Sequence, residues 1–270
     1  MLESYFFIPG DKISFLEKTK RIQSDFYVFD LEDSVSKKNK PVAFNQLMRM
    51  TINENTFVRI PFIDDSFSLQ QKSQLINHFK GRIVIPKIKK PSDFTRIINQ
   101  HDIKYDLKTI LLVETPECLI QLNEILSKHS NNIKAVGFGS HDFCNIMEIK
   151  HELKNLIHYK KDLILKAKAF GKSYIDSVDL NLKDFSDFEA ECLWSFQNGA
   201  NGKFLIHPRQ LDKLKEVEFL SEKERQKITR VYHKIKSLSL DEIDILKIED
   251  EVYEMPHIQK IINLHERMTK

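Results

Sequence analysis

The sequence predicts an α/β protein built as a TIM-type (β/α)8 barrel with a C-terminal helical extension. Eight short apolar runs alternate with amphipathic segments of helical length, a pattern typical of repeated βα units. Right-handed crossovers in such units give a parallel sheet, and eight strands close it into a barrel. A chain of 270 residues is long enough for one such barrel. The expected strands are 4–8, 26–30, 56–60, 82–86, 109–114, 133–138, 172–176 and 203–207.

Proline residues mark the starts of three expected helices. Pro91, Pro116 and Pro208 each open an amphipathic segment, where the missing proline N–H leaves no helical hydrogen bond unmade. All three follow an expected strand by a few residues, as a helix in a βα unit does.

The chain continues beyond the eighth expected βα unit. A polar helix is expected over 221–237, and a final helix from about Pro256. We therefore expect a catalytic barrel domain over 1–220 and a helical extension over 221–270. The extension is long enough to act as a lid or to contact a neighbouring subunit.

Composition excludes several classes of protein. The 42 basic and 39 acidic residues leave a net charge of +3, which is too small and too dispersed for a nucleic-acid-binding surface. Cys118, Cys144 and Cys192 are widely spaced, so neither a disulfide framework nor a zinc site is expected. No signal peptide is expected, since no basic segment followed by an apolar one opens the sequence, and no apolar run is long enough to cross a membrane. A cytoplasmic enzyme with a small-molecule substrate is the expectation.

Carboxylates end three of the expected strands. Asp30, Glu32 and Asp33 follow one strand, Glu114 ends another, and Asp142 lies just after a third. The C-terminal ends of all strands in a (β/α)8 barrel lie at the same mouth, and barrel enzymes carry their active sites there. Glu114 and Asp142 follow neighbouring strands, and two carboxylates with open positions suit magnesium. Acids at strand ends also occur by chance, so the spacing alone leaves the metal site open.

Two cations and a glycine pair accompany these acids. Arg59 ends its strand at the same mouth, where its planar fork suits a substrate carboxylate or a developing oxyanion. The alternative is an ion pair between Arg59 and the acids at 30–33. Lys87 is a weaker candidate for the same role in substrate binding. The alternative is that it only balances the local negative charge. Gly137 and Gly139 indicate a close approach of the backbone to a ligand.

A family resemblance runs along nearly the whole chain. It lies in YFFIPGDKISFLEK, FDLEDSVSKKNKPVA, FVRIPF, IVIPKI, LLVETPECLIQLNEIL, VGFGSHDF, YIDSVDLNLKDFSDFEAE, NGANGKFLIHPRQL and EDEVYEMPHIQKIINLHERM. In this order, the segments resemble the citrate lyase beta subunit (CitE)-like branch of the HpcH/HpaI aldolase family. The opening segment implies a strand followed directly by a helix.

The resemblance implies a barrel lyase that uses Mg²⁺, with Mn²⁺ as a substitute. Its substrate would be a 3-hydroxy-acid thioester of the citryl, malyl or citramalyl type, carried on coenzyme A or acyl carrier protein. By motif position, Glu114 and Asp142 become the metal ligands and Arg59 the substrate-binding arginine. Family members are commonly homotrimers whose C-terminal segment brings an acid to a neighbour's site. The matching acid in this chain is Glu254.

The expected reaction is cleavage of a carbon–carbon bond into an oxo acid and an acyl thioester. Removal of the hydroxyl proton would start it, through a metal-bound water held by Glu32 or Asp33. Arg59 would offset charge on the substrate oxygens, and Glu254 would protonate the enolate carbon. Lys87, Glu114 and Gly139 are further expected substrate contacts. Two alternatives are an aldolase acting on a free hydroxy-oxo acid and a non-catalytic ligand-binding protein.

Four positions depart from the family pattern. Phe44 replaces an arginine, Pro61 an asparagine, Glu251 a glycine and Glu254 an aspartate. A longer acid at position 254 moves the carboxyl group by about one methylene, and misplacements near 1 Å cost catalysis heavily. Pro61 removes an amide that a substrate could meet. These changes leave open a different carrier, a different acyl group or a loss of activity.

Overall fold

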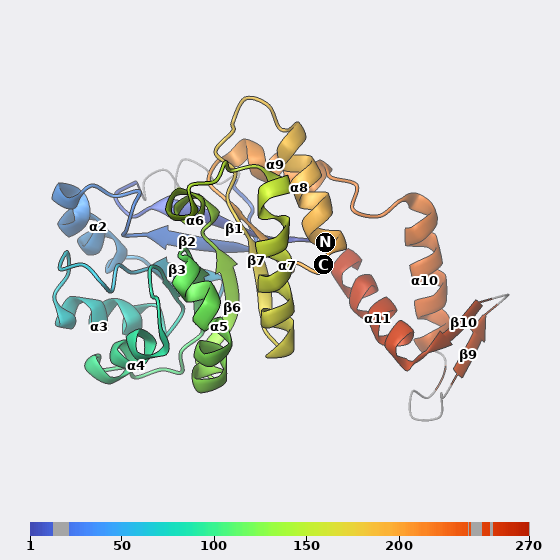
Figure 1. Ribbon diagram of the computed structural model, residues 1–270, viewed down its shortest axis with the longest axis horizontal. Helices are drawn as coiled ribbons and strands as arrows, with labels where there is room; N and C mark the ends of the chain where they lie inside the picture. The colour runs from blue at the N-terminus through green and yellow to red at the C-terminus, as the bar shows by residue number, and fades with distance from the viewer. Residues whose placement is uncertain (13–21, 237, 239–244, 249–250, 270) are drawn as a thin grey trace. The chain divides into compact units, whose positions relative to one another are not determined.

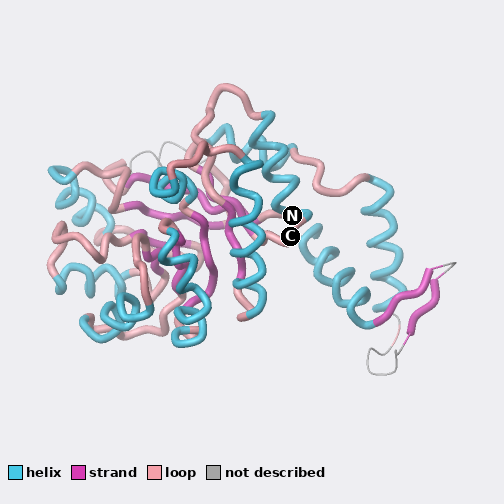
Figure 2. The backbone as a smooth tube through the Cα atoms, in the orientation of Figure 1, coloured by secondary structure: helices cyan, strands magenta, loops and turns pink. Residues whose placement is uncertain are grey.

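The computed structural model describes residues 1–12, 22–236, 238, 245–248 and 251–269. Two compact units make up the chain, which Figures 1 and 2 draw in one orientation. The larger unit is Glu3–Glu216, and the smaller combines Met1–Leu2 with Val217–Lys270. The role of the smaller unit as a lid or an oligomer contact stays a prediction.

The larger unit is a closed barrel of eight parallel strands in sequence order, which confirms the predicted fold. Each observed strand agrees with the expected one to within two residues at either end. The strands are β1 (Glu3–Pro9), β2 (Phe26–Asp30), β3 (Thr56–Arg59), β4 (Ile83–Ile85), β5 (Thr109–Val113), β6 (Ile133–Phe138), β7 (Ser173–Asp176) and β8 (Gly202–Leu205).

Helices surround the barrel strands (Figure 2). Pro91, Pro116 and Pro208 open α4, α5 and α9, as predicted. The helix expected after the first strand falls on residues 13–21, outside the described residues. The helical elements are η1 (Lys37–Asn39), α2 (Lys40–Leu47), α3 (Leu69–His78), α4 (Pro91–Gln100), α5 (Pro116–His129), α6 (Ser140–Met147), α7 (Leu153–Ala169), α8 (Ser186–Gln197) and α9 (Pro208–Glu216).

Side chains from every strand fill the barrel interior as one apolar cluster. This cluster consists of Tyr5, Val28, Phe57, Val84, Ile110, Leu112, Ala135, Ile175 and Phe204, all buried. Successive side chains of a strand alternate between faces, so residues two positions further along also point inward. At the C-terminal ends of β2, β3 and β5 these are Asp30, Arg59 and Glu114. The alternation thus places three charged groups directly above an apolar plug.

A second set of charges lies outside the barrel, between the strands and their covering helices. Asp176 and Lys203 neighbour inward-facing residues and therefore point outward. Lys203 Nζ lies 3.0 Å from Asp176 and 2.8 Å from Glu191 of α8. Lys160 of α7 contacts the same two carboxylates. Buried charges are tolerated because they are paired, and this network joins β7 and β8 to their helices rather than serving the mouth.

The smaller unit combines two helices with a two-stranded antiparallel sheet. Its elements are α10 (Glu222–Lys236), β9 (Ile245–Ile248), β10 (Glu251–Glu254) and α11 (Met255–Thr269). Both helices were predicted, and the strand pair was not. Ile228 and Val231 of α10 pack in one cluster with Ile258 of α11.

Across the described part of both units, no helix has the length and apolarity needed to cross a membrane.

Candidate active site at the barrel mouth

Arg59 and Asp30 form a bidentate ion pair inside the mouth. They are the last residues of β3 and β2, and they face each other in the strand register. Arg59 Nε lies 2.7 Å from Asp30 Oδ1, and Nη2 lies 2.6 Å from Oδ2. The ion pair that was the alternative for Arg59 is therefore present. Its remaining nitrogen, Nη1, points to the other acids of the mouth, 3.1 Å from Glu32 Oε2.

Asp30 also shapes the loop that carries the next two acids. Its carboxylate accepts N–H hydrogen bonds from Glu32 at 2.8 Å and from Ser34 at 3.0 Å. Burial alone would raise the pKa of Asp30, but the Arg59 charge and these hydrogen bonds hold it below its usual value. An ionised Asp30 thus fixes both the arginine fork and the turn after β2.

Glu114 is almost completely buried at the end of β5. One oxygen, Oε2, accepts the backbone N–H of Lys87 at 2.7 Å. A Cβ atom at position 139 would lie 2.2 Å from Glu114 Cγ, so the bare backbone of Gly139 makes room for this side chain. Burial, followed by the nearby charge of Glu32, raises the pKa of Glu114 to about 8. The close approach at Gly139 is thus to Glu114, and its contact with a substrate stays a prediction.

Asp142 lies on the first turn of α6, with its Oδ2 3.8 Å from Lys87 Nζ. After burial and the charge of Glu32, the charge of Asp142 also helps to raise the pKa of Glu114. The Asp142 side chain is 47% exposed, whereas Glu114 is 4% exposed. Glu114 would therefore be a buried, rigidly held metal ligand, and Asp142 an exposed ligand at the edge of the mouth.

The donor set fits a hard divalent cation. Five carboxyl groups (Asp30, Glu32, Asp33, Glu114 and Asp142) lie around only two cationic side chains, Arg59 and Lys87. Among the described residues, no three His, Cys, Asp or Glu side chains form a complete metal cage. Two carboxylates with the remaining positions left to water and substrate oxygens is the arrangement that magnesium prefers.

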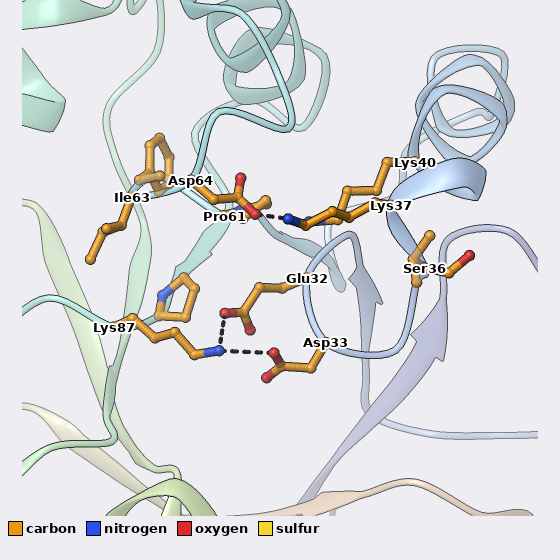
Figure 3. A pocket seen from close by; sticks show the side chains of 12 residues that line it. Glu32, Asp33, Ser36, Lys37, Lys40, Pro61, Ile63, Asp64 and Lys87 are labelled. Atoms are coloured by element: carbon orange, nitrogen blue, oxygen red, sulfur yellow. Dashed lines mark hydrogen bonds and ion pairs between the residues drawn. The ribbon is translucent and has the colours of Figure 1, made fainter.

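The ammonium group of Lys87 lies among the same acids (Figure 3). Its Nζ is 2.7 Å from Glu32 Oε1 and 2.8 Å from Asp33 Oδ1. Burial nevertheless raises the pKa of Glu32 to about 7. The hydrogen bond from Lys87 and the charge of Arg59 outweigh burial at Asp33 and lower its pKa. Glu32 can therefore exchange a proton near neutral pH, while Asp33 stays ionised.

A pocket of about 430 Å³ adjoins these acids. Glu32, Asp33 and Lys87 line one side, and the loop after β3 lines the other with Pro61 and its neighbours (Figure 3). An ion pair of 2.9 Å between Lys40 of α2 and Asp64 holds this loop. The pocket is large enough for part of a substrate that extends beyond the mouth.

The structure brings seven of the expected site residues together at one mouth. These are Glu32, Asp33, Arg59, Lys87, Glu114, Gly139 and Asp142. Glu254 ends β10 in the smaller unit, and its contribution to the mouth stays a prediction. Asp30 was noted in the acidic run but was not predicted as a site residue. The signal in the sequence was its spacing of two residues from the apolar Val28, which gives both side chains the same inward face.

Three of the four departures from the family pattern have local explanations. Phe44 packs against Phe67, with ring centroids 6.0 Å apart, so an apolar contact stands where an arginine would carry charge. Pro61 is buried in the wall of the pocket. Glu251 accepts an ion pair from Lys227 at 2.6 Å within the smaller unit.

Comparisons with known proteins agree with this geometry. Residues 3–208 match the family model described as HpcH/HpaI aldolase/citrate lyase. A (3S)-malyl-CoA thioesterase from Cereibacter sphaeroides is 26% identical over 218 residues, covering 77% of this chain and 74% of the relative. The citrate lyase subunit beta of Haemophilus influenzae is 22% identical over 274 residues, covering 95% of this chain and 93% of the relative.

A solved structure shares the fold along the whole chain. CitE from Mycobacterium tuberculosis, in complex with magnesium, acetoacetate and coenzyme A, superposes with a TM-score of 0.78 at 20% identity. The match covers 100% of this chain and 98% of that one. A citrate lyase beta subunit from the same organism, complexed with oxaloacetate and magnesium, gives a TM-score of 0.68 at 21% identity and covers 82% of this chain and 97% of that one.

Proposed function

Because the chain belongs to the HpcH/HpaI aldolase/citrate lyase family, we propose that it is a magnesium-dependent carbon–carbon lyase. Its substrate is a 3-hydroxy-acid thioester, which it cleaves into an oxo acid and an acyl thioester. The observation that carries this proposal is the buried Glu114 beside the exposed Asp142, in an acid-rich mouth that also holds Arg59. The binding of magnesium and oxaloacetate by a structural relative supports it.

The residues of the mouth divide the work of binding and charge control. Glu114 and Asp142 would hold the magnesium ion, whose chemistry is Lewis-acid polarisation of the substrate's hydroxyl and carboxylate oxygens. Arg59 turns Nη1 toward the centre of the mouth, where it offsets negative charge that grows on the substrate oxygens. Asp30 keeps the guanidinium in that orientation through its bidentate grip.

Proton transfer starts and ends the reaction. Glu32, with a pKa of about 7, takes up the hydroxyl proton as the carbon–carbon bond breaks. The bonding electrons pass to the thioester, which becomes an enolate, and the carbon that bore the hydroxyl becomes the oxo acid carbonyl. Glu254 from a neighbouring subunit then protonates the enolate carbon. The pocket beside Pro61 receives the thioester arm of coenzyme A or of an acyl carrier protein.

The assembly and location of the enzyme form part of the same proposal. A homotrimer would supply Glu254 to each barrel from another chain. We also propose that the enzyme is cytoplasmic and accepts Mn²⁺ in place of Mg²⁺. The binding of coenzyme A by a structural relative supports the choice of carrier.

A second candidate function is hydrolysis of the same class of thioester. Relatives that cover 77% of this chain are (3S)-malyl-CoA thioesterases, which favours this candidate. The two reactions leave different products. Cleavage releases an oxo acid and keeps the thioester bond, whereas hydrolysis releases a free thiol and a hydroxy acid.

One assay separates these functions. Malyl-, citramalyl- and citryl-coenzyme A are incubated with the protein and magnesium, and both oxo acid and free thiol are measured. We expect oxo acid without a matching release of thiol, and none after chelation of the metal. Release of thiol without oxo acid would assign the chain to hydrolysis. Turnover of free hydroxy-oxo acids alone would make it an aldolase, and binding without turnover would remove the enzymatic proposal.

A further inference from the structure

Lys87 contacts the carboxyl groups of the mouth in two ways, through its backbone N–H and through its side-chain ammonium group. It follows β4 with a φ of 58°, a left-handed conformation that side-chain-bearing residues rarely adopt. In this conformation its backbone N–H donates to Glu114 Oε2 at 2.7 Å. Its side chain runs instead to the loop after β2 (Figure 3). Residues held in this region of backbone space concentrate at functional sites, so the position calls for an explanation beyond local charge balance.

The ammonium group is a tethered cation inside the acidic mouth. Nζ contacts Glu32 Oε1 at 2.7 Å and Asp33 Oδ1 at 2.8 Å, and lies 3.8 Å from Asp142 Oδ2. It thus stands between the acids of the β2 loop and one of the two expected metal ligands. A divalent cation at Asp142 would have this ammonium as its neighbour.

A metal ion that must also bind substrate can accept only a few ligands from the protein. Magnesium sites that bind substrate use one or two carboxylates and keep the other positions for water and substrate oxygens. Four carboxyl groups (Glu32, Asp33, Glu114 and Asp142) reach this mouth. If all four bound one cation, the ion would be held tightly but closed to substrate.

We propose that Lys87 is a positioning residue that divides the carboxylate cluster and keeps the metal open to substrate. Its N–H occupies one oxygen of Glu114, which leaves the other for the cation. Its ammonium withholds Glu32 and Asp33, so that only Glu114 and Asp142 are available as ligands. This inference rests on the proposed metal site and deepens it, because it assigns the openness of the site to one side chain.

Binding of Mn²⁺ to the intact protein tests the inference without any substrate. Lys87→Met removes the ammonium and keeps the backbone N–H to Glu114. Mn²⁺ affinity, measured by calorimetry, should rise at least roughly tenfold, because affinity for such cations follows the number of charged ligands. The relaxation of water protons by bound Mn²⁺ should fall, since carboxylates replace exchangeable water.

Three variants serve as controls. Lys87→Arg keeps the charge and should bind Mn²⁺ as the wild type does. Adding Glu32→Gln and Asp33→Asn to Lys87→Met should return the affinity to about the wild-type value, which identifies the source of the gain. Lys87→Gln offers a second neutral side chain in case the methionine variant does not fold.

The outcomes separate this inference from the proposed function. Unchanged or weaker Mn²⁺ binding by folded Lys87→Met, with normal binding by the wild type, overturns the inference and leaves the lyase proposal to its own product assay. Tighter binding without loss of water relaxation overturns it as well, since the added carboxylates would not be ligands. If neither protein binds Mn²⁺, both the inference and the metal site fail.

Discussion

Arg59 and Asp30 end neighbouring strands in direct register and share two hydrogen bonds, of 2.7 and 2.6 Å. This pair forms the floor of the mouth, because both side chains continue the inward face of strands whose preceding inward residues, Val28 and Phe57, belong to the apolar barrel cluster. The carboxylate orients the guanidinium, and the guanidinium keeps the buried carboxylate ionised. The geometry of the whole site therefore depends on a fork that only arginine provides.

Arg59→Lys should lower kcat/KM at least roughly tenfold, although the positive charge is kept. Lysine lacks the planar fork, so it cannot grip Asp30 with two nitrogens and present a third to the mouth. Steady-state kinetics with the best thioester substrate measure the effect. Equal activity of the lysine variant would make Arg59 a general source of positive charge.

Asp30→Asn should destabilise the folded protein by about 3–5 kcal/mol, the usual cost of breaking one side of a buried ion pair. Asp30 is 1% exposed, so water does not replace the lost charge. Chemical denaturation measures the loss. Glu124→Gln is the matched control, because its ion pair with Lys128 is exposed and should contribute less than about 1 kcal/mol. Similar losses in both variants would contradict the buried-pair argument.

Glu114→Gln and Asp142→Asn should each abolish magnesium binding and leave the barrel folded. Each substitution removes one of the two anionic protein ligands, and in the absence of substrate only water is left to replace it. Calorimetric titration and circular dichroism measure the two properties. Glu117→Gln is the control, since Glu117 is an exposed acid on the first turn of α5, paired with Lys89. Magnesium affinity that survives both site substitutions would remove this pair as the metal site.

Stability should fall as pH rises from about 4.5 to about 8. Burial and the charge of Glu32 raise the pKa of Glu114 from 4.5 to about 8, and burial raises that of Glu32 to about 7. The folded state therefore binds these protons more tightly than the unfolded state and loses stability when they leave. Thermal melts across this range measure the slope, which Glu114→Gln should flatten.

Magnesium should reverse this trend. The metal binds ionised carboxyl groups, so it should raise the melting temperature more near pH 8 than near pH 6. Protons should be released on binding, which calorimetry in buffers of different ionisation enthalpy detects. A metal effect that is the same at both pH values would show that Glu114 is already ionised at the lower one.

The barrel could be predicted from the sequence because its signal is local and repeated. Each strand is a short apolar run, and burial on both faces requires such runs in a parallel barrel. Glu32, Arg59, Glu114 and Asp142 could be assigned to one mouth for the same reason, since strand polarity alone puts their positions there. The strand ends were correct to within two residues.

The contacts between these groups could not be predicted in the same way. That Asp30, rather than Glu32 or Asp33, takes the bidentate grip on Arg59 depends on strand register, which the sequence does not state. The bond from the Lys87 N–H to Glu114 depends on a left-handed backbone angle at a residue that is not glycine. The pairing of β9 with β10 was missed because its strands are short and half-exposed.

Glu254 should act in trans, from a neighbouring subunit. It ends β10 in the smaller unit, where it is exposed and its backbone N–H donates to His257 Nδ1 at 3.3 Å. The resemblance of the closing segment to one that family members lend across subunits motivates the prediction. Glu254→Ala and Arg59→Ala should each be inactive alone, because one lacks the proton donor and the other the substrate grip.

Mixing these two inactive variants should restore activity, since some sites in a mixed oligomer receive an intact Arg59 from one chain and an intact Glu254 from another. In a trimer that assembles at random, a minority of sites regains both groups, so the recovered rate should stay below that of the wild type. Differently tagged chains, purified in succession, measure subunit exchange independently. Exchange without recovered activity would mean that Glu254 serves its own barrel or has no catalytic role. A mixture of Glu254→Ala with Glu251→Ala provides the control, because Glu251 is held by Lys227 inside its own unit and its loss should leave activity largely intact.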